Sequence, residues 1–114
     1  MRRINRPWGY ETIWAESSRY LAKIVAIMSG KHTVLQMHKI KDTTFLVQRG
    51  TVKIEHGTSK SDLKTTQLEA GQAWNVPSGT LYRFFAVTDV EMIEASSSEI
   101  ADTVRFEEEN VETK

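Results

Sequence analysis

Apolar and polar positions alternate with a period of two along most of the chain, and no segment keeps an apolar stripe of helical spacing. The pattern therefore predicts an all-β protein of short strands joined by turns. Glycine, proline, serine, threonine and aspartate mark the breaks, and the clearest loop falls at residues 57–62. The predicted strands cover residues 10–15, 19–28, 32–38, 43–49, 51–56, 63–68, 73–76, 81–87 and 90–95.

Short strands at such regular spacing are typical of an antiparallel sandwich or barrel. Residues 19–28 are apolar on both faces of the predicted strand, so the face turned away from the core needs a second cover. That cover is either the other sheet or a second copy of the chain, and we expect a homodimer. We expect a single domain over residues 1–114, with an N-terminal arm at 1–9 and an acidic C-terminal tail at 107–114.

Composition and charge narrow the function classes. The 114 residues include 15 basic and 15 acidic side chains, so the formal net charge is zero and a nucleic-acid partner is not expected. Cysteine is absent, which excludes disulfides and thiolate catalysis and fits a reducing compartment. No apolar run approaches the roughly 18 residues of a membrane span, and no secretory signal is visible. We therefore expect a cytoplasmic protein without a membrane partner.

Two glycine-framed segments carry the strongest signal. The first reads GKHTVLQMHKIKDTTFLVQRG at residues 30–50, and the second reads GQAWNVPSGTLYRFFA at residues 71–86. Their order and spacing resemble the two motifs of the cupin superfamily. The matching positions are Gly30, Gly50, Gly71, Pro77 and Gly79. The resemblance implies a double-stranded β-helix, or jelly roll, of two packed antiparallel sheets.

Within the cupins, the chain resembles type II phosphomannose isomerases and the C-terminal domain of mannose-1-phosphate guanylyltransferases. The similarity runs over nearly the whole chain and implies a sugar or sugar-phosphate context. It is carried by RPWG at 6–9, LQMH at 35–38, HKIKD at 38–42, IEAS at 93–96 and DTVRFE at 102–107.

The same resemblance implies a metal site, but this sequence departs from its pattern. Gln36 and His38 fall on the first two ligand positions, whereas Thr43 stands at the carboxylate position and Tyr82 at the last histidine position. A threonine hydroxyl and a neutral phenol are weak donors for divalent metals. We therefore expect no cofactor, or at most a weakly bound divalent metal at Gln36 and His38. His38 is the best catalytic candidate, and the alternative is that it hydrogen-bonds Thr43 or Tyr82 inside the barrel.

Strand parity predicts which side chains share the barrel interior. Aromatic walls with a few polar groups suit a small sugar-like ligand, although Phe45 and Phe84 are also well suited to plain core packing. The predicted lining residues are Gln36, His38, Thr43, Phe45, Tyr82 and Phe84, with Trp74 and Glu94 on neighbouring strands. Cations that pair well with phosphate are Lys23, Lys41, Arg83 and Arg105, each of which has a solvated or surface ion-paired role as the alternative.

Two functions remain open on these residues. The preferred hypothesis is a cupin with a degenerate metal site that binds a small sugar or sugar phosphate. The alternative is an active aldose–ketose isomerase acting on mannose 6-phosphate or a similar sugar phosphate. Such a reaction needs a base and a group that polarises the carbonyl. His38 is a candidate base, but the sequence offers no strong electrophile.

Overall fold

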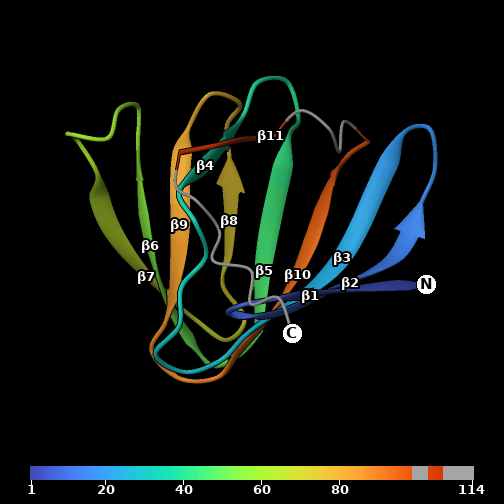
Figure 1. Ribbon diagram of the computed structural model, residues 1–114, viewed down its shortest axis with the longest axis horizontal. Helices are drawn as coiled ribbons and strands as arrows, with labels where there is room; N and C mark the ends of the chain where they lie inside the picture. The colour runs from blue at the N-terminus through green and yellow to red at the C-terminus, as the bar shows by residue number, and fades with distance from the viewer. Residues whose placement is uncertain (99–102, 107–114) are drawn as a thin grey trace.

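The computed structural model describes residues 1–98 and 103–106 and shows an all-β protein (Figure 1). The predicted acidic tail at 107–114 lies outside the described residues. None of the described residues forms a helix long and apolar enough to cross a membrane. The strands in the described part of the chain are β1 (Arg2–Arg6), β2 (Gly9–Glu16), β3 (Tyr20–Ile27), β4 (Gln36–His38), β5 (Thr43–Arg49), β6 (Thr51–Gly57), β7 (Lys64–Glu69), β8 (Ala73–Val76), β9 (Leu81–Ala86), β10 (Val90–Ser97) and β11 (Thr103–Arg105).

The strands form two antiparallel sheets that face each other across the core. The six-stranded sheet has the order β1-β2-β3-β10-β5-β8, and the five-stranded sheet has the order β11-β4-β9-β6-β7. Figure 1 shows the five-stranded sheet on the left and most of the six-stranded sheet on the right. Strands distant in sequence are neighbours in both sheets, as in a jelly roll. The predicted double-stranded β-helix is confirmed.

The core fills the space between the sheets and follows the predicted alternation. On β5 the buried positions are Thr43, Phe45 and Val47, which are spaced by two residues. The ring centroids of Phe45 and Phe84 lie 4.7 Å apart in an edge-to-face arrangement. Both rings belong to the main hydrophobic cluster, so the core role considered for them is confirmed.

The structure adds pairing that the apolar pattern does not reveal. The segment expected to be an arm contains β1, which pairs with β2 as a hairpin at the sheet edge. Its sequence RRINR has only one apolar residue, because an edge strand buries little of its surface. The predicted strand at 32–38 is regular only in β4, and His32 makes an isolated bridge with Phe85. The strand β11 pairs with β4 and was not predicted.

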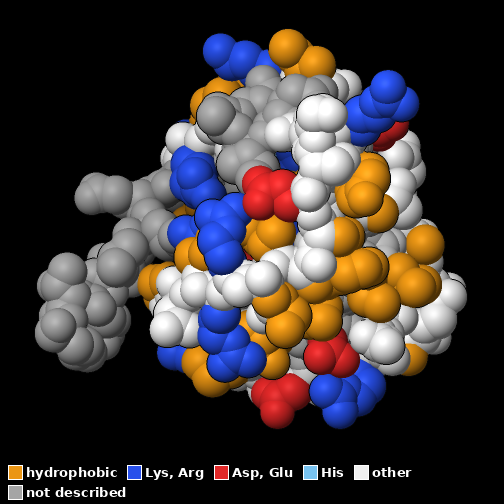
Figure 2. Space-filling view, turned by 90° about the vertical axis from the view of Figure 1, so that its right-hand side faces the viewer, with side chains coloured by type: hydrophobic (Ala, Val, Ile, Leu, Met, Phe, Trp, Pro, Cys, Tyr) orange, Lys and Arg blue, Asp and Glu red, His pale blue; other side chains and the backbone are white. Residues whose placement is uncertain are grey.

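The outer face of the six-stranded sheet carries an apolar row. The row is in register across five strands and consists of the apolar residues Ile24, Ile93, Leu46 and Ala73, with Thr12 at one end. Leu46 is 40% exposed, and nearby Trp14 is 52% exposed. Figure 2 shows hydrophobic side chains gathered over part of the side where β1, β2 and β3 lie, with charged side chains around them. The strand β3 therefore has the two apolar faces that its sequence indicated.

The glycine that ends the first motif generates a stability prediction. Gly50 has a φ of 90°, and a Cβ there would collide with the carbonyl oxygen of Asp89. Gly50→Ala should lower the free energy of unfolding by about 3 kcal/mol or more, because the collision adds to the roughly 1–2 kcal/mol cost of a left-handed alanine.

Gly71 provides the matched control. Its φ is 91°, yet a Cβ there meets nothing within 4 Å. Gly71→Ala should therefore cost only the backbone term, about 1–2 kcal/mol. Urea unfolding of both variants measures the difference, and equal losses would show that the contact between Gly50 and Asp89 is not tight.

Candidate functional site

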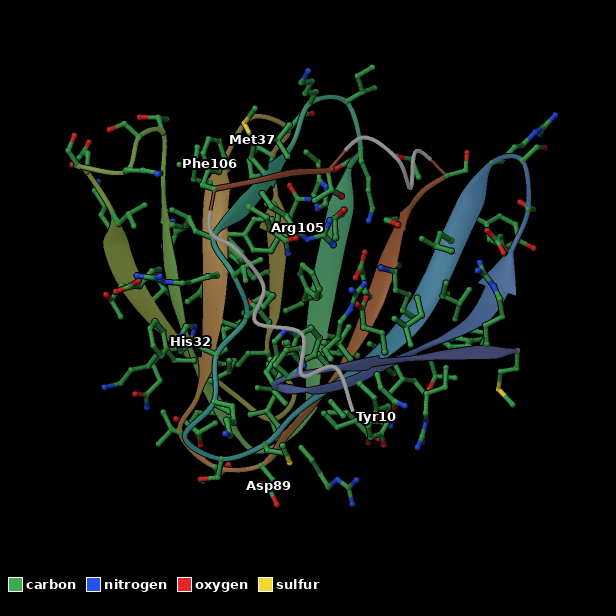
Figure 3. All side chains as sticks on the ribbon, in the orientation of Figure 1. Tyr10, His32, Met37, Asp89, Arg105 and Phe106 are labelled. Carbon is green, nitrogen blue, oxygen red and sulfur yellow. The ribbon has the colours of Figure 1, made fainter. Side chains whose placement is uncertain are left out.

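A cavity of about 250 Å³ lies between the two sheets near the β1 and β11 edges. Side chains from both sheets and from the segment between β3 and β5 line it. Figure 3 shows Arg105 extending from β11 toward this space. The lining residues are Arg2, Ile4, Arg6, Trp8, Glu11, Ile13, Lys23, Val25, Thr33, Val34, Gln36, His38, Lys41, Phe45, Tyr82, Phe84, Glu94, Thr103 and Arg105.

The structure brings most of the predicted site residues to this cavity. Those that line it are Gln36, His38, Lys41, Tyr82, Phe84, Glu94 and Arg105, together with Lys23 and Phe45. Thr43 is buried just beside them without lining the cavity, and Trp74 packs against Tyr82 and Phe84 instead. Arg83 is not among the lining residues and pairs with Glu55 at 2.7 Å, so the structure favours the surface ion pair over an anchoring role.

Charged side chains cross the inner face of the six-stranded sheet in one continuous line of ion pairs. Arg6 on β1 lies 2.8 Å from Glu11 on β2, and Glu11 lies 2.8 Å from Lys23 on β3. Lys23 is 3.9 Å from Glu94 on β10, and Glu94 is 3.0 Å from Lys41. We call these five residues the charge ladder. Because a buried charge is stable only when paired, each member holds its neighbours in place.

The structure does not place Lys41 in the solvated or surface role that was considered for it as the alternative. It lies in the turn between β4 and β5, yet only 3% of its side chain is exposed. Glu94, which is 4% exposed, draws the ammonium group inward from the neighbouring strand β10. Strand periodicity gives no information about a turn residue, so the sequence did not indicate this burial.

The ion pairs outweigh burial in setting the pKa of Glu11. Removal from water raises the pKa of this carboxyl, but the nearby charges and hydrogen bonds of Lys23 and Arg6 lower it by more. The net pKa lies below the ordinary value of 4.5. Glu11 is therefore ionised at neutral pH and contributes stability there.

A second hydrogen-bonded network occupies the facing sheet. His38 Nε2 lies 2.7 Å from the Tyr82 hydroxyl, and His38 Nδ1 lies 3.0 Å from Thr103 Oγ1. Of the two interior partners considered for His38, Thr43 and Tyr82, the structure shows Tyr82. Burial and the charges of Glu94 and Glu11 raise the pKa of Tyr82 well above its ordinary value, so its phenol is neutral.

The metal ligand set that cupins use does not fit these residues. Both ring nitrogens of His38 are engaged by hydroxyl groups, and the neutral phenol of Tyr82 is a weak donor. Thr43 Oγ1 is buried without a hydrogen-bond partner, and its hydroxyl replaces the carboxylate of the motif. Over residues 1–98 and 103–106, no group of three histidine or acidic side chains is arranged to hold a metal ion.

Several lining residues lay outside the sequence prediction. Arg2 and Arg6 reach the cavity because β1 folds back along β2. No alternation of apolar and polar residues in the sequence indicates this pairing. Glu11 did carry a signal, since it is an acidic residue at an inward position of an alternating strand. Trp8 is also buried and lines the cavity.

Comparison with known families decides the classification. The family model of the mannose-6-phosphate isomerase C-terminal domain matches residues 1–108. The chain belongs to this family. No curated protein matches the chain in sequence.

Solved cupin structures share the fold of this family member. The chain is similar to KdgF from Halomonas sp., with a TM-score of 0.76, 20% identity and coverage of 90% of this chain and 92% of that one. It is also similar to the formate complex of the Lactobacillus farciminis oxalate decarboxylase, with a TM-score of 0.79 and 18% identity. That match covers 93% of this chain but 33% of the decarboxylase, and both likenesses show the fold alone.

The charge ladder predicts a pH-dependent effect of Glu11→Gln. The folded-state pKa of Glu11 is lowered, so its stabilising contribution is present above the unfolded-state pKa and is lost as the pH falls through the folded-state value. Glu11→Gln should reduce the free energy of unfolding by about 3 kcal/mol at pH 7, because Arg6 and Lys23 lose their shared partner.

Urea unfolding between pH 7 and pH 3 checks this expectation. The difference between wild type and Glu11→Gln should shrink as the pH falls below 4.5. The control Glu55→Gln breaks the more exposed pair with Arg83 and should cost under about 1 kcal/mol at every pH. A constant difference between wild type and Glu11→Gln across the range would contradict the assignment.

Proposed function

We propose that this cupin binds a small, anionic, hydroxyl-rich ligand of the sugar-phosphate class in the cavity, without a metal. The observation that carries the proposal is the charge of the cavity wall. Five cationic side chains line the cavity against two carboxylates, Glu11 and Glu94. An excess of fixed positive charge in a partly closed space favours an anion. The volume of about 250 Å³ favours a small one.

Arg105 is the proposed anchor for the anionic group. It is exposed on β11, lines the cavity and has no carboxylate partner among the ion pairs of the described residues. Its register partner is Gln36, which in turn is opposite Tyr82. A guanidinium binds phosphate through paired hydrogen bonds. The hydroxyls of the ligand then lie deeper, against the amide of Gln36 and the Lys41–Glu94 pair.

The family supports the sugar-phosphate class, because its name refers to mannose-6-phosphate isomerases. Metal independence is supported by the hydroxyl partners of His38 and by the donor set at Thr43 and Tyr82. A cytoplasmic location is part of the proposal, since the chain lacks cysteine and sugar phosphates are polar intracellular metabolites as a class.

The alternative function, sugar-phosphate isomerisation, is favoured by one specific observation. Sequence reasoning offered no electrophile, but the buried ammonium group of Lys41 lies in the cavity beside the carboxylate of Glu94. A cation and a base in contact with the same ligand are the minimum for enolisation.

We also propose that a second copy of the chain covers the outer face of the six-stranded sheet. The apolar row ending at Leu46 and Ala73 runs beside a hollow of about 570 Å³ lined in part by Tyr10 and Met28. That hollow is lined by Arg49, Asp89 and Glu91, so it carries charges of both signs. A face with an apolar centre and charges of both signs can pair with a second copy related by two-fold rotation, because the positive charge of one copy can meet a negative charge of the other. An isologous dimer requires such self-complementarity.

The ligand proposal predicts the effect of Arg105→Gln. After dialysis against EDTA, wild-type protein should bind mannose 6-phosphate in calorimetry and bind mannose at least tenfold more weakly. Arg105→Gln should weaken mannose 6-phosphate binding by at least tenfold, about 1.4 kcal/mol, because the phosphate loses its anchor. The matched control Arg83→Gln removes a cation outside the cavity and should leave affinity unchanged. Binding that appears only after a divalent metal is added would refute the proposal.

The dimer proposal predicts the effect of Ile93→Lys at the centre of the apolar row. Wild-type protein should sediment as a dimer at micromolar concentration, and Ile93→Lys should sediment as a folded monomer because two ammonium groups would meet at the axis. Thr65→Lys on the exposed part of β7 is the control and should remain dimeric. A monomeric wild type would show that the outer face has another role.

A further inference from the structure

The outer face of the six-stranded sheet has an exposed aromatic side chain at one end and a hollow at the other. Trp14 on β2 is 52% exposed and is the unpaired residue of a β-bulge between Ile13 and Ala15, a feature that redirects a side chain. The hollow of about 570 Å³ lies where β2 begins and β3 ends, and Tyr10 and Asp89 are among its lining residues. Figure 3 shows both of these residues at the lower end of the molecule.

The apolar row lies midway between these two features. It runs across the strands, because its members are register partners, and it ends at Thr12 on β2. Tyr10 precedes Thr12 by two residues, and Trp14 follows it by two. These two residues therefore lie about 6.6 Å to either side of the row, measured along the strand. Their alternation with the cavity-lining Glu11 and Ile13 places all three residues, Tyr10, Thr12 and Trp14, on the outer face.

We infer that, in the dimer proposed above, Trp14 of each copy fills the hollow of the other copy, and that the two-fold axis lies along the apolar row. This inference rests on that dimer proposal. Rotation about an axis along the row exchanges the two directions along every strand. Trp14 of one copy is then placed over Tyr10 of the second copy, at the hollow. The contact occurs twice in each dimer, as an isologous interface requires.

The hollow has the shape and chemistry that an indole ring needs. The small side chain of Ala26 leaves space in its wall, and Met28, which is 49% exposed, supplies an adaptable apolar contact. The Arg3 guanidinium lies 3.8 Å from the centroid of the Tyr10 ring and holds that ring in place. The indole N–H of a buried tryptophan needs an acceptor, and the carboxylate of Glu91 lines the same hollow.

An axis parallel to the strands would not produce this contact. Rotation about such an axis keeps each end of the strands facing the same end in the second copy. Trp14 would then lie at the end of the interface where Trp14 of the second copy lies, and the two hollows would face each other unfilled. Well-packed interfaces bury aromatic anchors in pockets of the partner, so the axis along the row is favoured.

Sedimentation of three variants tests the contact. Trp14→Ala should raise the dissociation constant of the dimer about 100-fold, because each of the two lost contacts costs about tenfold. Ala26→Lys should have a similar effect, because its side chain fills the hollow. That variant should fold, since the introduced ammonium group can pair with Glu91, the register partner of Ala26 on β10. The control is Met37→Ala on β4 of the other sheet, which should dimerise like wild type.

An equimolar mixture of Trp14→Ala and Ala26→Lys makes the test decisive. In the mixed dimer, the intact Trp14 of one copy meets the open hollow of the other, and the filled hollow faces no tryptophan. The mixed dimer should therefore form about tenfold more tightly than either variant pairs with itself. A dimeric wild type with either variant unimpaired, or a mixture without this gain, overturns the inference and leaves the dimer proposal standing. A monomeric wild type overturns both.

Discussion

The charge ladder on the inner face of the six-stranded sheet is the constraint on which the site depends. It joins Arg6, Glu11, Lys23, Glu94 and Lys41 in an order that follows the strands β1, β2, β3 and β10 and ends in the turn before β5. Two carboxylates cannot be buried in a β-sandwich without such partners. The ladder therefore fixes β1 against the sheet and draws Lys41 into the interior, and it leaves the cavity with more positive than negative charge.

The cavity lined by Gln36 and His38, two positions of the metal-binding cupin motif, is also lined by cationic side chains. The ligand positions hold Thr43 and Tyr82, and His38 is engaged by the hydroxyls of Tyr82 and Thr103. Ammonium and guanidinium groups from the opposite sheet and from β11 instead surround the space. Side-chain cations are weaker Lewis acids than a divalent metal, but they bind anions and stabilise developing negative charge by the same electrostatic attraction. The cavity thus has a polar lining with more cationic than anionic side chains.

The fold could be predicted well from the sequence, because the two signals that indicate it, residue alternation and the motif glycines, are local. Alternation along β5, β9 and β10 and the glycines of the two motifs determine strands and turns directly. The sequence also predicted an interior hydrogen bond of His38 to Thr43 or Tyr82, and the structure shows the one to Tyr82. Contacts that depend on long-range pairing could not be predicted from the sequence. The strand β1 has only one apolar residue, β11 has only three residues, and Lys41 lies in a turn, so none of them has a periodic pattern. The ladder was missed because its members are far apart in sequence, although Lys23, Lys41 and Glu94 were each candidates for the site.

The most direct measurement is a crystal structure of the protein grown with manganese and soaked with mannose 6-phosphate. The central claim is that cationic side chains, and not a metal, receive the ligand. It predicts phosphate oxygens within hydrogen-bond distance of Arg105, sugar hydroxyls against Glu94 and Lys41, and no anomalous scattering peak beside His38. A manganese peak at His38 Nε2, with Tyr82 displaced and the sugar coordinated to the metal, would contradict it.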